Sequence, residues 1–497
     1  MDPLHGLLYG FSIAFAPANL LAALAGALIG TFVGVLPGIG PVGAMALLLA
    51  TTSALRPETA LIMLAGIYYG AMYGGSTTSI LVNVPGEAAS VVTALEGYQM
   101  AKRGRAGAAL AVSAVGSFVA GTLGVVGLMV AAPALARFAL SFGPPEYFAI
   151  ALLGLFALSR LSGGSFWKAL MMLALGMALA TIGMEPISGT SRYTFGLVKL
   201  MQGIDLVPVV MGLFGVAELL VVAESAGGLP QVTGVKFREL FPTIAEWRLA
   251  FPAIFRGTGL GFLIGLIPGP ATVISSFASY SLELRMSKRP DEFGRGAIEG
   301  VAGPESANNA ATSAQMVPLL ALGVPFGPAT ALLLAALMIQ GVQPGPLLMT
   351  ERPEVFWGVV TSMYVGNLAL LILNLPLVGM WVSLLRLPQP VLVASILLFM
   401  LIGAYSVNNS ALDLLVLVVM GIVGYVLRKL GFDLSGMILA LVLGPMLEKT
   451  FRQSLIMGLG DPLIFVKRPI SGVLVAAVLV IVVLPPLLRL GRRLRRG

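Results

Sequence analysis

The segment "GALIGTFVGVLPGIGP" (residues 26–41) has a close copy, "GTGLGFLIGLIPGPAT" (257–272), later in the chain, and this repeat is the strongest indication of the architecture. Five positions match at a constant offset of 231 residues: Gly26, Gly30, Gly34, Pro37 and Gly38 pair with Gly257, Gly261, Gly265, Pro268 and Gly269. Glycines at every fourth position line one helix face and let another backbone approach closely within lipid. The Pro-Gly pair then ends each helix and frees backbone groups.

Composition places both copies in a membrane. The chain has 497 residues, of which 58% are hydrophobic and only 10% are charged, whereas soluble proteins carry about 25% charged residues. Apolar runs such as 20–36 and 473–488 recur from end to end and are continuous rather than alternating. We therefore predict an all-α polytopic membrane protein with about 12 transmembrane helices, at roughly 20 residues per span, and not a β-barrel.

The charges indicate topology rather than a nucleic-acid partner. The net charge is +8, and the basic residues lie in short loops and in the tail "RLGRRLRRG" (489–497). This is typical of the positive-inside rule, so we expect a cytoplasmic C-terminus. The beginning, "MDPLHGLLYGF", lacks the basic region of a cleavable signal peptide, so the first helix is expected to direct insertion. The absence of cysteine excludes disulfides and thiolate chemistry.

A second pair of segments extends the repeat. Gly66, Gly70 and Ser76 align with Gly296, Gly300 and Ser306 at an offset of 230, whereas Val84-Pro85 aligns with Val324-Pro325 at an offset of 240. On this alignment the second half carries about ten extra residues between its polar cluster and its Val-Pro pair. The two clusters are then counterparts that are not fully equivalent.

We expect four parts: a first transmembrane repeat (1–224), a polar linker (225–248), a second repeat (249–470), and a last helix with the basic tail (471–497). The basic loop "KRGR" (102–105) follows the first polar cluster, but "LRMSKRPDEFGR" (284–295) precedes the second. If both loops are cytoplasmic, equivalent points of the repeats face opposite sides. This predicts two inverted-topology repeats, as in many secondary transporters.

Each polar cluster is predicted to lie in a re-entrant hairpin or broken helix, near 66–90 and 296–329. The segment from Gly70 to Val84 is short for a full span, and Pro85, Gly86 and Pro325 interrupt the helices. Hydroxyl and amide oxygens can coordinate Na⁺, and half-helix N-termini attract anions. The candidate substrate- or ion-binding residues are Ser76, Thr77, Thr78, Ser79, Asn83, Ser306, Asn308, Asn309, Thr312 and Ser313. The alternative is that they join helices by hydrogen bonds.

Two carboxylates accompany these clusters. Glu87 follows Pro85-Gly86, and Glu305 follows Gly303-Pro304. An intramembrane carboxylate is a candidate for ion or proton coupling, but one at a helix start can simply oppose the helix dipole. Four basic residues near span ends are expected to reach the membrane surface rather than clamp a substrate: Arg137, Arg160, Lys168 and Arg192.

Four stretches carry a family resemblance: "GVLPGIGP", "YGGSTTSILVNVPGEAASVVTALEGYQMAKRGRAGAAL", "GLIPGP" and "GPESANNAATSAQMVPLLALGVP". Together they resemble the large membrane subunit of tripartite tricarboxylate transporters, the TctA family, over nearly the whole chain. The resemblance implies uptake of carboxylates such as citrate across the bacterial inner membrane. It also implies a small transmembrane subunit, a periplasmic solute-binding protein and an ion gradient as the driving force.

We therefore expect secondary active transport by alternating access, with Na⁺ or H⁺ as the coupling ion and no other cofactor. No phosphate-binding loop of the type that binds ATP is present. A passive channel is the main rival, because repeated broken helices also suit channels. An intramembrane enzyme is disfavoured, because His5 is the sole histidine and no metal or serine-histidine motif exists. A purely structural or receptor subunit would not depend on the polar clusters.

Overall fold

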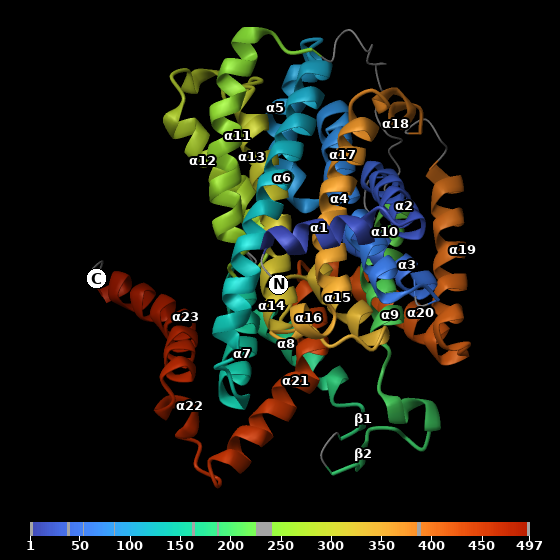
Figure 1. Ribbon diagram of the computed structural model, residues 1–497, viewed down its shortest axis with the longest axis vertical. Coiled ribbons are helices and arrows are strands. Elements are labelled where there is room, and N and C mark those ends of the chain that lie inside the picture. Colours follow the sequence, from blue (N-terminus) through green and yellow to red (C-terminus); the bar gives the residue numbers. More distant parts are fainter. Residues whose placement is uncertain are drawn as a thin grey trace.

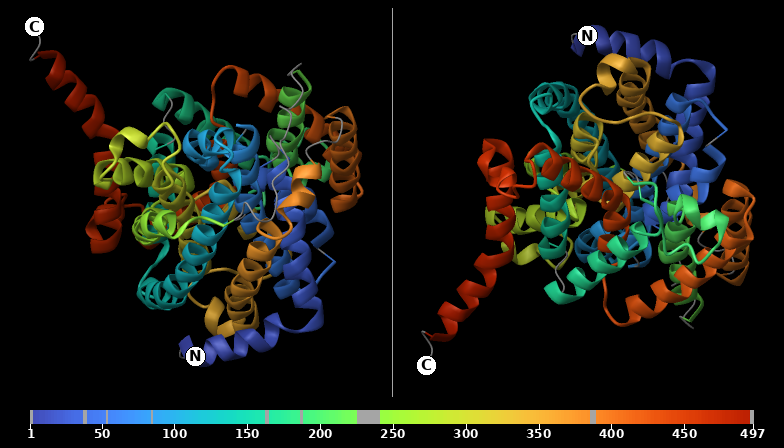
Figure 2. Two further views of the ribbon diagram at one scale, coloured as in Figure 1. Left: turned by 90° about the horizontal axis from the view of Figure 1, so that it is seen from above. Right: turned by 90° about the horizontal axis from the view of Figure 1, so that it is seen from below.

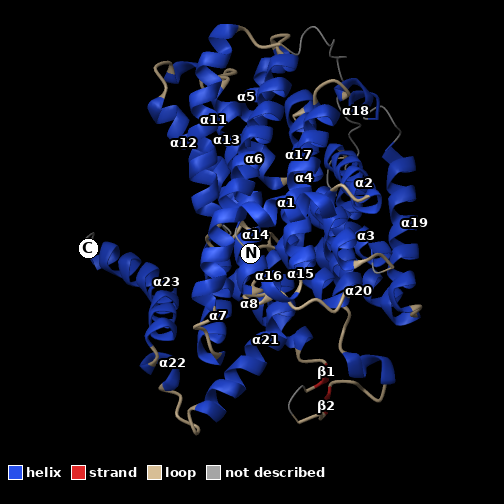
Figure 3. Ribbon diagram, viewed as in Figure 1, coloured by secondary structure: helices blue, strands red, loops and turns tan. Residues whose placement is uncertain are grey.

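The computed structural model describes residues 3–36, 40–52, 54–83, 85–161, 165–185, 188–224, 241–384 and 389–494. These residues are almost entirely helical, and β1 and β2 form one short antiparallel ladder (Figure 3). Five described segments are long and apolar enough to cross a membrane: Pro17–Val35, Ala106–Ala139, Leu206–Glu224, Pro353–Asn374 and Ala411–Lys429. Shorter apolar helices accompany them. The all-α polytopic class is confirmed.

The first half consists of α1 (Pro3–Ala14), α2 (Pro17–Val35), α3 (Gly40–Thr52), α4 (Pro57–Val82), η1 (Ala88–Ser90), α5 (Val91–Lys102), α6 (Ala106–Ala139), α7 (Pro144–Leu161), α8 (Phe166–Ala180), β1 (Gly183–Met184), β2 (Ser191–Arg192), η2 (Val198–Gln202), α9 (Leu206–Val210), η3 (Met211–Val216) and α10 (Ala217–Glu224). Most of the predicted linker, residues 225–240, lies outside the described residues. Its end, from Ile244 onward, already belongs to α11.

The second half consists of α11 (Ile244–Gly265), α12 (Ala271–Met286), η5 (Pro290–Glu292), α13 (Glu299–Ala314), α14 (Met316–Leu322), α15 (Pro328–Ile339), α16 (Leu348–Glu351), α17 (Pro353–Asn374), α18 (Val378–Leu384), α19 (Gln389–Asn408), α20 (Ala411–Lys429), α21 (Ser435–Met457), α22 (Ile464–Lys467) and α23 (Pro469–Leu494). Figures 1 and 2 both show α23 extending away from the other helices, with the C-terminus at its far end.

The glycine ladders hold the two closest helix pairs together. α2 packs along α4, and α11 packs along α13. A Cβ at Gly30 would lie 2.4 Å from the Ile67 carbonyl oxygen, and one at Gly261 would lie 2.2 Å from that of Ala307. Such approaches are impossible for a real side chain, so glycine is required at both places. The predicted role of the ladders in close helix packing is confirmed.

The same contacts correct the alignment of the polar clusters. Gly26, Gly30 and Gly34 face the carbonyls of Met63, Ile67 and Ala71, and their repeat counterparts face those of Gly303, Ala307 and Ala311. Each pair of carbonyl partners differs by 240 residues, not 230. The predicted match of Ser76 with Ser306 is therefore wrong, since Ser76 corresponds to Met316 and Ser306 to Gly66. The extra residues of the second half lie before α13, in the connection 287–298.

The ends of the two matched helices confirm the offset of 240. The residue that follows α4 is Asn83 and the residue that follows α14 is Gly323, and both are left-handed, with φ of 56° and 71°. After the Val-Pro pairs, the Glu87 N–H donates to the Ser90 hydroxyl, and the Gly327 N–H donates to the Thr330 hydroxyl. The same capping geometry thus begins η1–α5 and α15.

The first polar cluster does not lie in a broken helix as predicted. α4 runs without interruption from Pro57 to Val82 and includes Ser76–Ser79. The glycines of this helix pack against α2, so they serve contact rather than helix breaking. The second repeat differs, because the helix is interrupted at Gln315, between α13 and α14. Pro318 follows three residues later and cannot donate an N–H to the preceding turn.

The two repeats run in opposite directions. Ser76 of α4 contacts Glu305 of α13, whereas Tyr68, two turns earlier in α4, contacts Gln315, further along the second helix. α4 and α13–α14 therefore cross antiparallel. The basic connections after α5 and after α12 lie together at the upper end in Figure 1, and Glu96 of α5 accepts hydrogen bonds from Gly296 and Ala297. Their shared position agrees with the predicted inversion.

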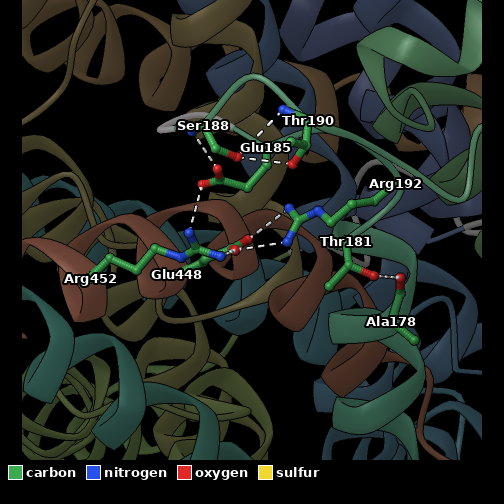
Figure 4. A network of polar contacts seen from close by, with 8 residues as sticks. All are labelled: Ala178, Thr181, Glu185, Ser188, Thr190, Arg192, Glu448 and Arg452. Atoms are coloured by element: carbon green, nitrogen blue, oxygen red, sulfur yellow. Dashed lines mark hydrogen bonds and ion pairs between the residues drawn. The ribbon is translucent and has the colours of Figure 1, made fainter.

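At the opposite end, the β1–β2 hairpin is fixed to α21 (Figure 4). Arg192 donates to both carboxylate oxygens of Glu448, at 2.8 and 3.0 Å. Arg452 lies 3.1 Å from Glu448 and 3.4 Å from the buried Glu185. Two arginines thus hold two glutamates in one network, which joins the α8–α9 connection to the second repeat.

Candidate functional site

A cavity of about 420 Å³ lies where four interhelical connections of the two repeats meet. Residues 40–42 of the first repeat and 269–273 of the second line it from equivalent positions. Residues 85–88 and 327–329 line it from the equivalent connections that follow α4 and α14. A volume of this size is typical of sites for small molecules. The repeat therefore builds a cavity from two matched sets of residues.

Three helices begin at the wall of this cavity: α3 at Gly40, α12 at Ala271 and α15 at Pro328. The first N–H groups of a helix have no partner within that helix. They carry partial positive charge and are favourable contacts for an anion. Their convergence makes this wall attractive for a carboxylate.

Arg428 of α20 adds a full positive charge to the same cavity. It is the only cationic side chain lining the cavity among the described residues. It forms an ion pair with Glu218 of α10, and its guanidinium carbon lies 5.6 Å from the centre of the Phe214 ring. A guanidinium can bind a carboxylate through two parallel hydrogen bonds. Arg428 is therefore the strongest candidate for substrate recognition.

Tyr68 and Gln315 close one side of the cavity between the repeats. The Tyr68 hydroxyl donates to the Gln315 side-chain oxygen at 3.0 Å, and the Gln315 nitrogen donates to the Gly269 carbonyl at 3.4 Å. One chain of hydrogen bonds thus joins α4, the interruption of α13–α14, and the predicted Pro-Gly break. The contact links both repeats at the cavity wall.

Glu87 is the predicted carboxylate that reaches the cavity. One of its oxygens accepts from the Ala89 N–H at 2.9 Å, and the other accepts from the Asn308 side-chain nitrogen at 2.9 Å. The Asn308 side-chain oxygen is buried and has no hydrogen-bond partner. A carboxylate bonded to an amide whose own oxygen has no partner offers oxygen atoms of the kind that suit a hard cation such as Na⁺.

Glu305 lies deeper, in a closed polar network between the repeats. It is buried and accepts hydrogen bonds from Ser76 at 2.6 Å, from Ser113 at 3.1 Å and from Thr93. These donors come from α4, α6 and α5. Three hydroxyl groups therefore stabilise the carboxylate, which does not line the cavity. Glu305 and Glu87 thus occupy different environments, although both were predicted as coupling or dipole carboxylates.

The remaining predicted ligands form no single binding surface with Asn308. The Ser79 hydroxyl lies within hydrogen-bond distance of the Gly75 carbonyl and the Ser90 hydroxyl. The Asn309 amide donates to Ser117 and to the Glu305 carbonyl. Four other hydroxyls bond back to their own helices, which is a structural role: Thr78, Ser306, Thr312 and Ser313. Thr77 is buried in α4, and Asn83 is exposed at its end.

The predicted helix breaks divide in a similar way. Pro85, Gly86 and Gly269 line the cavity, and Pro268 lies between α11 and α12. Pro325 lies in the connection between α14 and α15. Pro37 and Gly38 lie outside the described residues, in the connection between α2 and α3. Three of the five described break residues therefore line the cavity, and Pro268 and Pro325 do not.

Sequence reasoning overlooked Arg428, Glu218, Tyr68 and Gln315. The sequence does hold a signal for Glu218, which is a charge within the apolar segment Leu206–Glu224, because intramembrane charges are functional candidates. Arg428 lies beside Lys429 in the last turn of α20, where a basic residue is ordinary. The other two carry no comparable signal. They become candidates only once the structure brings α4 and α13–α14 together.

Comparison with known proteins agrees with this architecture of a multi-pass membrane transport component. The chain belongs to the tripartite tricarboxylate transporter TctA family, whose model matches residues 20–439. It is 47% identical over 485 residues to an uncharacterized 52.8 kDa protein in the TAR-I ttuC′ 3′ region of Agrobacterium vitis, covering 97% of this chain and 96% of that protein.

A second Agrobacterium vitis protein, an uncharacterized one in the TAR-II ttuC′ 3′ region, is 49% identical over 224 residues. That match covers 45% of this chain and 93% of the relative. No solved structure matches this chain. The family is that of a transporter component, and the chain is accordingly a membrane component of a tripartite transport system.

Proposed function

We propose that this chain takes up dicarboxylates or tricarboxylates across the bacterial inner membrane by secondary active transport. The observation that carries the proposal is the meeting of three helix N-termini and Arg428 at one cavity between inverted repeats. All of these groups favour a carboxylate, and the two repeats supply matching walls. A periplasmic solute-binding protein would deliver the substrate, and a small transmembrane subunit would complete the system.

The Arg428–Glu218 pair gives a physical account of substrate binding. With no substrate present, the Glu218 carboxylate pairs with the Arg428 guanidinium, so the arginine is not left unpaired in an apolar setting. An arriving carboxylate competes with Glu218 for the same donors. Binding therefore exchanges one carboxylate for another, and the displaced glutamate must find a new partner.

Glu87 and Asn308 supply a place for the coupling ion beside the substrate. Glu87 lines the cavity, and the Asn308 amide contacts it through its nitrogen and holds a buried oxygen without a hydrogen-bond partner. A bound Na⁺ would offset the negative charge of Glu87 and of the incoming substrate. This charge balance makes substrate binding and ion binding mutually favourable, which is what symport requires.

Alternating access follows from the position of the cavity. Its walls belong to two repeats that run in opposite directions, so a movement of one repeat against the other can open it to either side. Arg428 and Phe214 come from helices α20 and η3, outside the matched connections. When one repeat moves, the residues of the matched connections would therefore face different parts of α20 and η3 in the inward-open and outward-open states.

Transport in proteoliposomes tests the proposal. We expect saturable uptake of labelled citrate or a dicarboxylate that depends on the solute-binding protein and on an inward Na⁺ gradient. Preloaded unlabelled substrate should accelerate entry of label by counterflow. A passive channel would show flux without saturable exchange, and that result would overturn the carrier assignment. A proton gradient that replaces Na⁺ would reassign the coupling ion.

Variants of the charged pair locate the substrate site. Arg428→Gln should raise the half-saturating substrate concentration by roughly tenfold or more, since a charge-assisted hydrogen bond contributes about 1.5–3 kcal/mol. Glu218→Gln should lower it, because the competing carboxylate is gone. Arg137→Gln, at an exposed position of α6, is the matched control and should leave it unchanged. Equal kinetics in all three would remove Arg428 from the site.

Variants of the amides locate the ion site. Replacing Asn308 and Asn309 by Ala should abolish uptake without preventing membrane insertion. Asn308→Ala alone should weaken the dependence on Na⁺, because it removes the free oxygen beside Glu87. Normal uptake by the double variant would exclude this part of the site.

A further inference from the structure

A second cavity, of about 290 Å³, lies at the end of the molecule where the β1–β2 hairpin is found (Figure 1). It is formed by the residues that lead into α9 and by the turn between α19 and α20. Asp205 and Asp413 both line it. Nothing in the proposed transport mechanism uses either carboxylate.

The two carboxylates share one amide group. The Asn408 side-chain nitrogen donates to an Asp205 oxygen at 2.9 Å and to an Asp413 oxygen at 3.0 Å. The two negatively charged oxygens are therefore close enough for one bound ion to contact both of them. Neither aspartate has an ion-pair partner within the described part of the chain, and Asp413 is buried. Two like charges held together in this way call for a positive ligand.

An independent observation points to the same ligand. Ser410 lines this cavity, is only 2% exposed, and its side-chain oxygen has no hydrogen-bond partner. Ser410 is the residue before α20, where a serine ordinarily accepts a hydrogen bond from a helix N–H, but its side chain makes no such bond. A buried oxygen without a partner is costly. It is explained if the oxygen contacts something bound in the cavity.

We propose that Asp205, Asp413, Ser410 and Asn408 bind a divalent cation of the Ca²⁺ class. Rotation of the Asn408 amide would turn its oxygen toward the position that its nitrogen now occupies, since oxygen and nitrogen have nearly the same shape. Two carboxylates, a hydroxyl and an amide oxygen then surround the cavity. Oxygen ligands of this kind, with water completing the shell, are those that Ca²⁺ prefers.

The site is separate from the cavity of about 420 Å³ to which we assign the carboxylate substrate. Asp413 and Arg428 both belong to α20, 15 residues apart, which corresponds to about 22 Å along a helix. The cation therefore cannot touch a substrate held by Arg428. Its effect is to fasten the start of α9, where an Asp205 oxygen accepts from the Val207 N–H, to the α19–α20 turn.

The location also fits a divalent ion of the outer compartment. The cavity lies at the end opposite the basic connections after α5 and α12 (Figure 1), which the positive-inside rule assigns to the cytoplasm. Calcium sites that face extracytoplasmic fluid bind with dissociation constants of about 10⁻⁴–10⁻³ M. We expect an affinity in that range.

Lys199 offers a competing account, because this exposed lysine also lines the cavity. If Lys199 were the natural counter-charge of the aspartates, Lys199→Met would lower thermal stability in the absence of calcium. If the aspartates bind a cation, Lys199→Met instead tightens calcium binding, because a repelling ammonium group is removed. The two outcomes have opposite consequences for the proposal.

The test is calcium binding to the purified full-length protein, measured by equilibrium dialysis with ⁴⁵Ca²⁺ and by thermal unfolding with and without a chelator. We expect one saturable site and a rise in the unfolding temperature on adding Ca²⁺. Asp205→Asn and Asp413→Asn should each weaken binding roughly tenfold or more. Asp205→Asn keeps an oxygen that can cap the start of α9, and Asp413→Asn keeps an oxygen acceptor for the Asn408 amide, so we expect both variants to fold.

Ser410→Ala provides the sharpest comparison. It should weaken calcium binding while leaving stability in chelator unchanged, because the hydroxyl has no protein partner. Asp461→Asn, which alters an exposed carboxylate paired with Lys467, is the matched control and should bind calcium normally. No saturable site in the native protein, or equal binding by all variants, would overturn the proposal. Stabilisation by Na⁺ with no response to Ca²⁺ would overturn the divalent assignment.

Discussion

α4 and its counterpart α13–α14 have the same backbone contacts but different chemistry. Both present small residues to a glycine ladder, and both end in a left-handed residue before a Val-Pro pair. Their polar residues lie at different levels, since Glu305 corresponds to Ala65 and Ser76 to Met316 under the offset of 240. Backbone packing tolerates no change at a close approach, whereas side chains that face the partner repeat can differ. The two repeats therefore share the same backbone packing, but their polar side chains lie at different positions along the matched helices.

The largest effect should come from the shared packing. Gly30→Val and Gly261→Val each place a side chain within 2.4 Å of a carbonyl oxygen in the partner helix, so neither repeat can close. We expect almost no folded protein, measured by size-exclusion chromatography of detergent extracts. Gly259→Val, on a face of α11 where nothing lies within 4 Å of the added Cβ, should be tolerated. Normal yields of the first two variants would refute the packing account.

The next largest effect should come from Glu305, a buried carboxylate of the second repeat whose counterpart in the first repeat is Ala65. Glu305→Ala leaves the hydroxyls of Ser76, Thr93 and Ser113 without their shared acceptor. We expect a loss of about 3 kcal/mol in the free energy of unfolding. Glu305→Gln, which keeps an oxygen acceptor, should cost less. The measurement is denaturant unfolding in detergent, and an equal loss in both variants would show that charge, not hydrogen bonding, stabilises this part of the structure.

A smaller effect is expected where the two helices cross near the cavity. Tyr68→Phe removes the hydrogen bond to Gln315 and should cost about 1 kcal/mol. Gln315→Leu should cost somewhat more, because it also removes the hydrogen bond to the Gly269 carbonyl. The double variant should cost little more than Gln315→Leu alone, because the bond to Tyr68 is then already lost. Thermal unfolding of all three variants measures this coupling. Fully additive losses would show that the bond does not join the repeats.

The smallest change in stability is expected at the left-handed residues that follow α4 and α14, Asn83 and Gly323. Asn83→Gly relieves a left-handed asparagine and should change stability by less than about 1 kcal/mol. The reverse exchange is not equivalent, since a Cβ at Gly323 would lie 2.8 Å from the Pro344 carbonyl oxygen. Gly323→Asn should therefore be the more damaging of the two. Equal unfolding temperatures for both variants would contradict the asymmetry.

The sequence predicted the helix class, the glycine ladder and the repeat because these depend on spacing along one chain. It failed on the alignment of Ser76 with Ser306, because the match relied on residue type in a polar cluster, where the repeats have diverged. The contacts of Ile67 and Ala307 with the ladders supply the correct offset. The cavity could not be predicted, since Arg428 and Tyr68 meet only through packing between distant helices.

The predicted ligands illustrate the same limit. Composition marked Thr78 and Thr312 as candidates, but each bonds back to its own helix. Glu87 and Asn308, which are 221 residues apart in the chain, form a contact that spacing cannot reveal. A cluster of polar letters therefore indicates where polar groups are needed, and the structure is required to show which of them face a cavity.

The hairpin network in Figure 4 has a mechanical consequence. Arg192 and Arg452 fasten the α8–α9 connection to α21 through Glu448 and Glu185. These ion pairs join one connection of the first repeat to one helix of the second, so the two segments are held together at this end of the molecule. In the proposed transport cycle we therefore expect α21 and the α8–α9 connection to move as one unit, while movement between the repeats occurs among the helices that line the cavity of about 420 Å³.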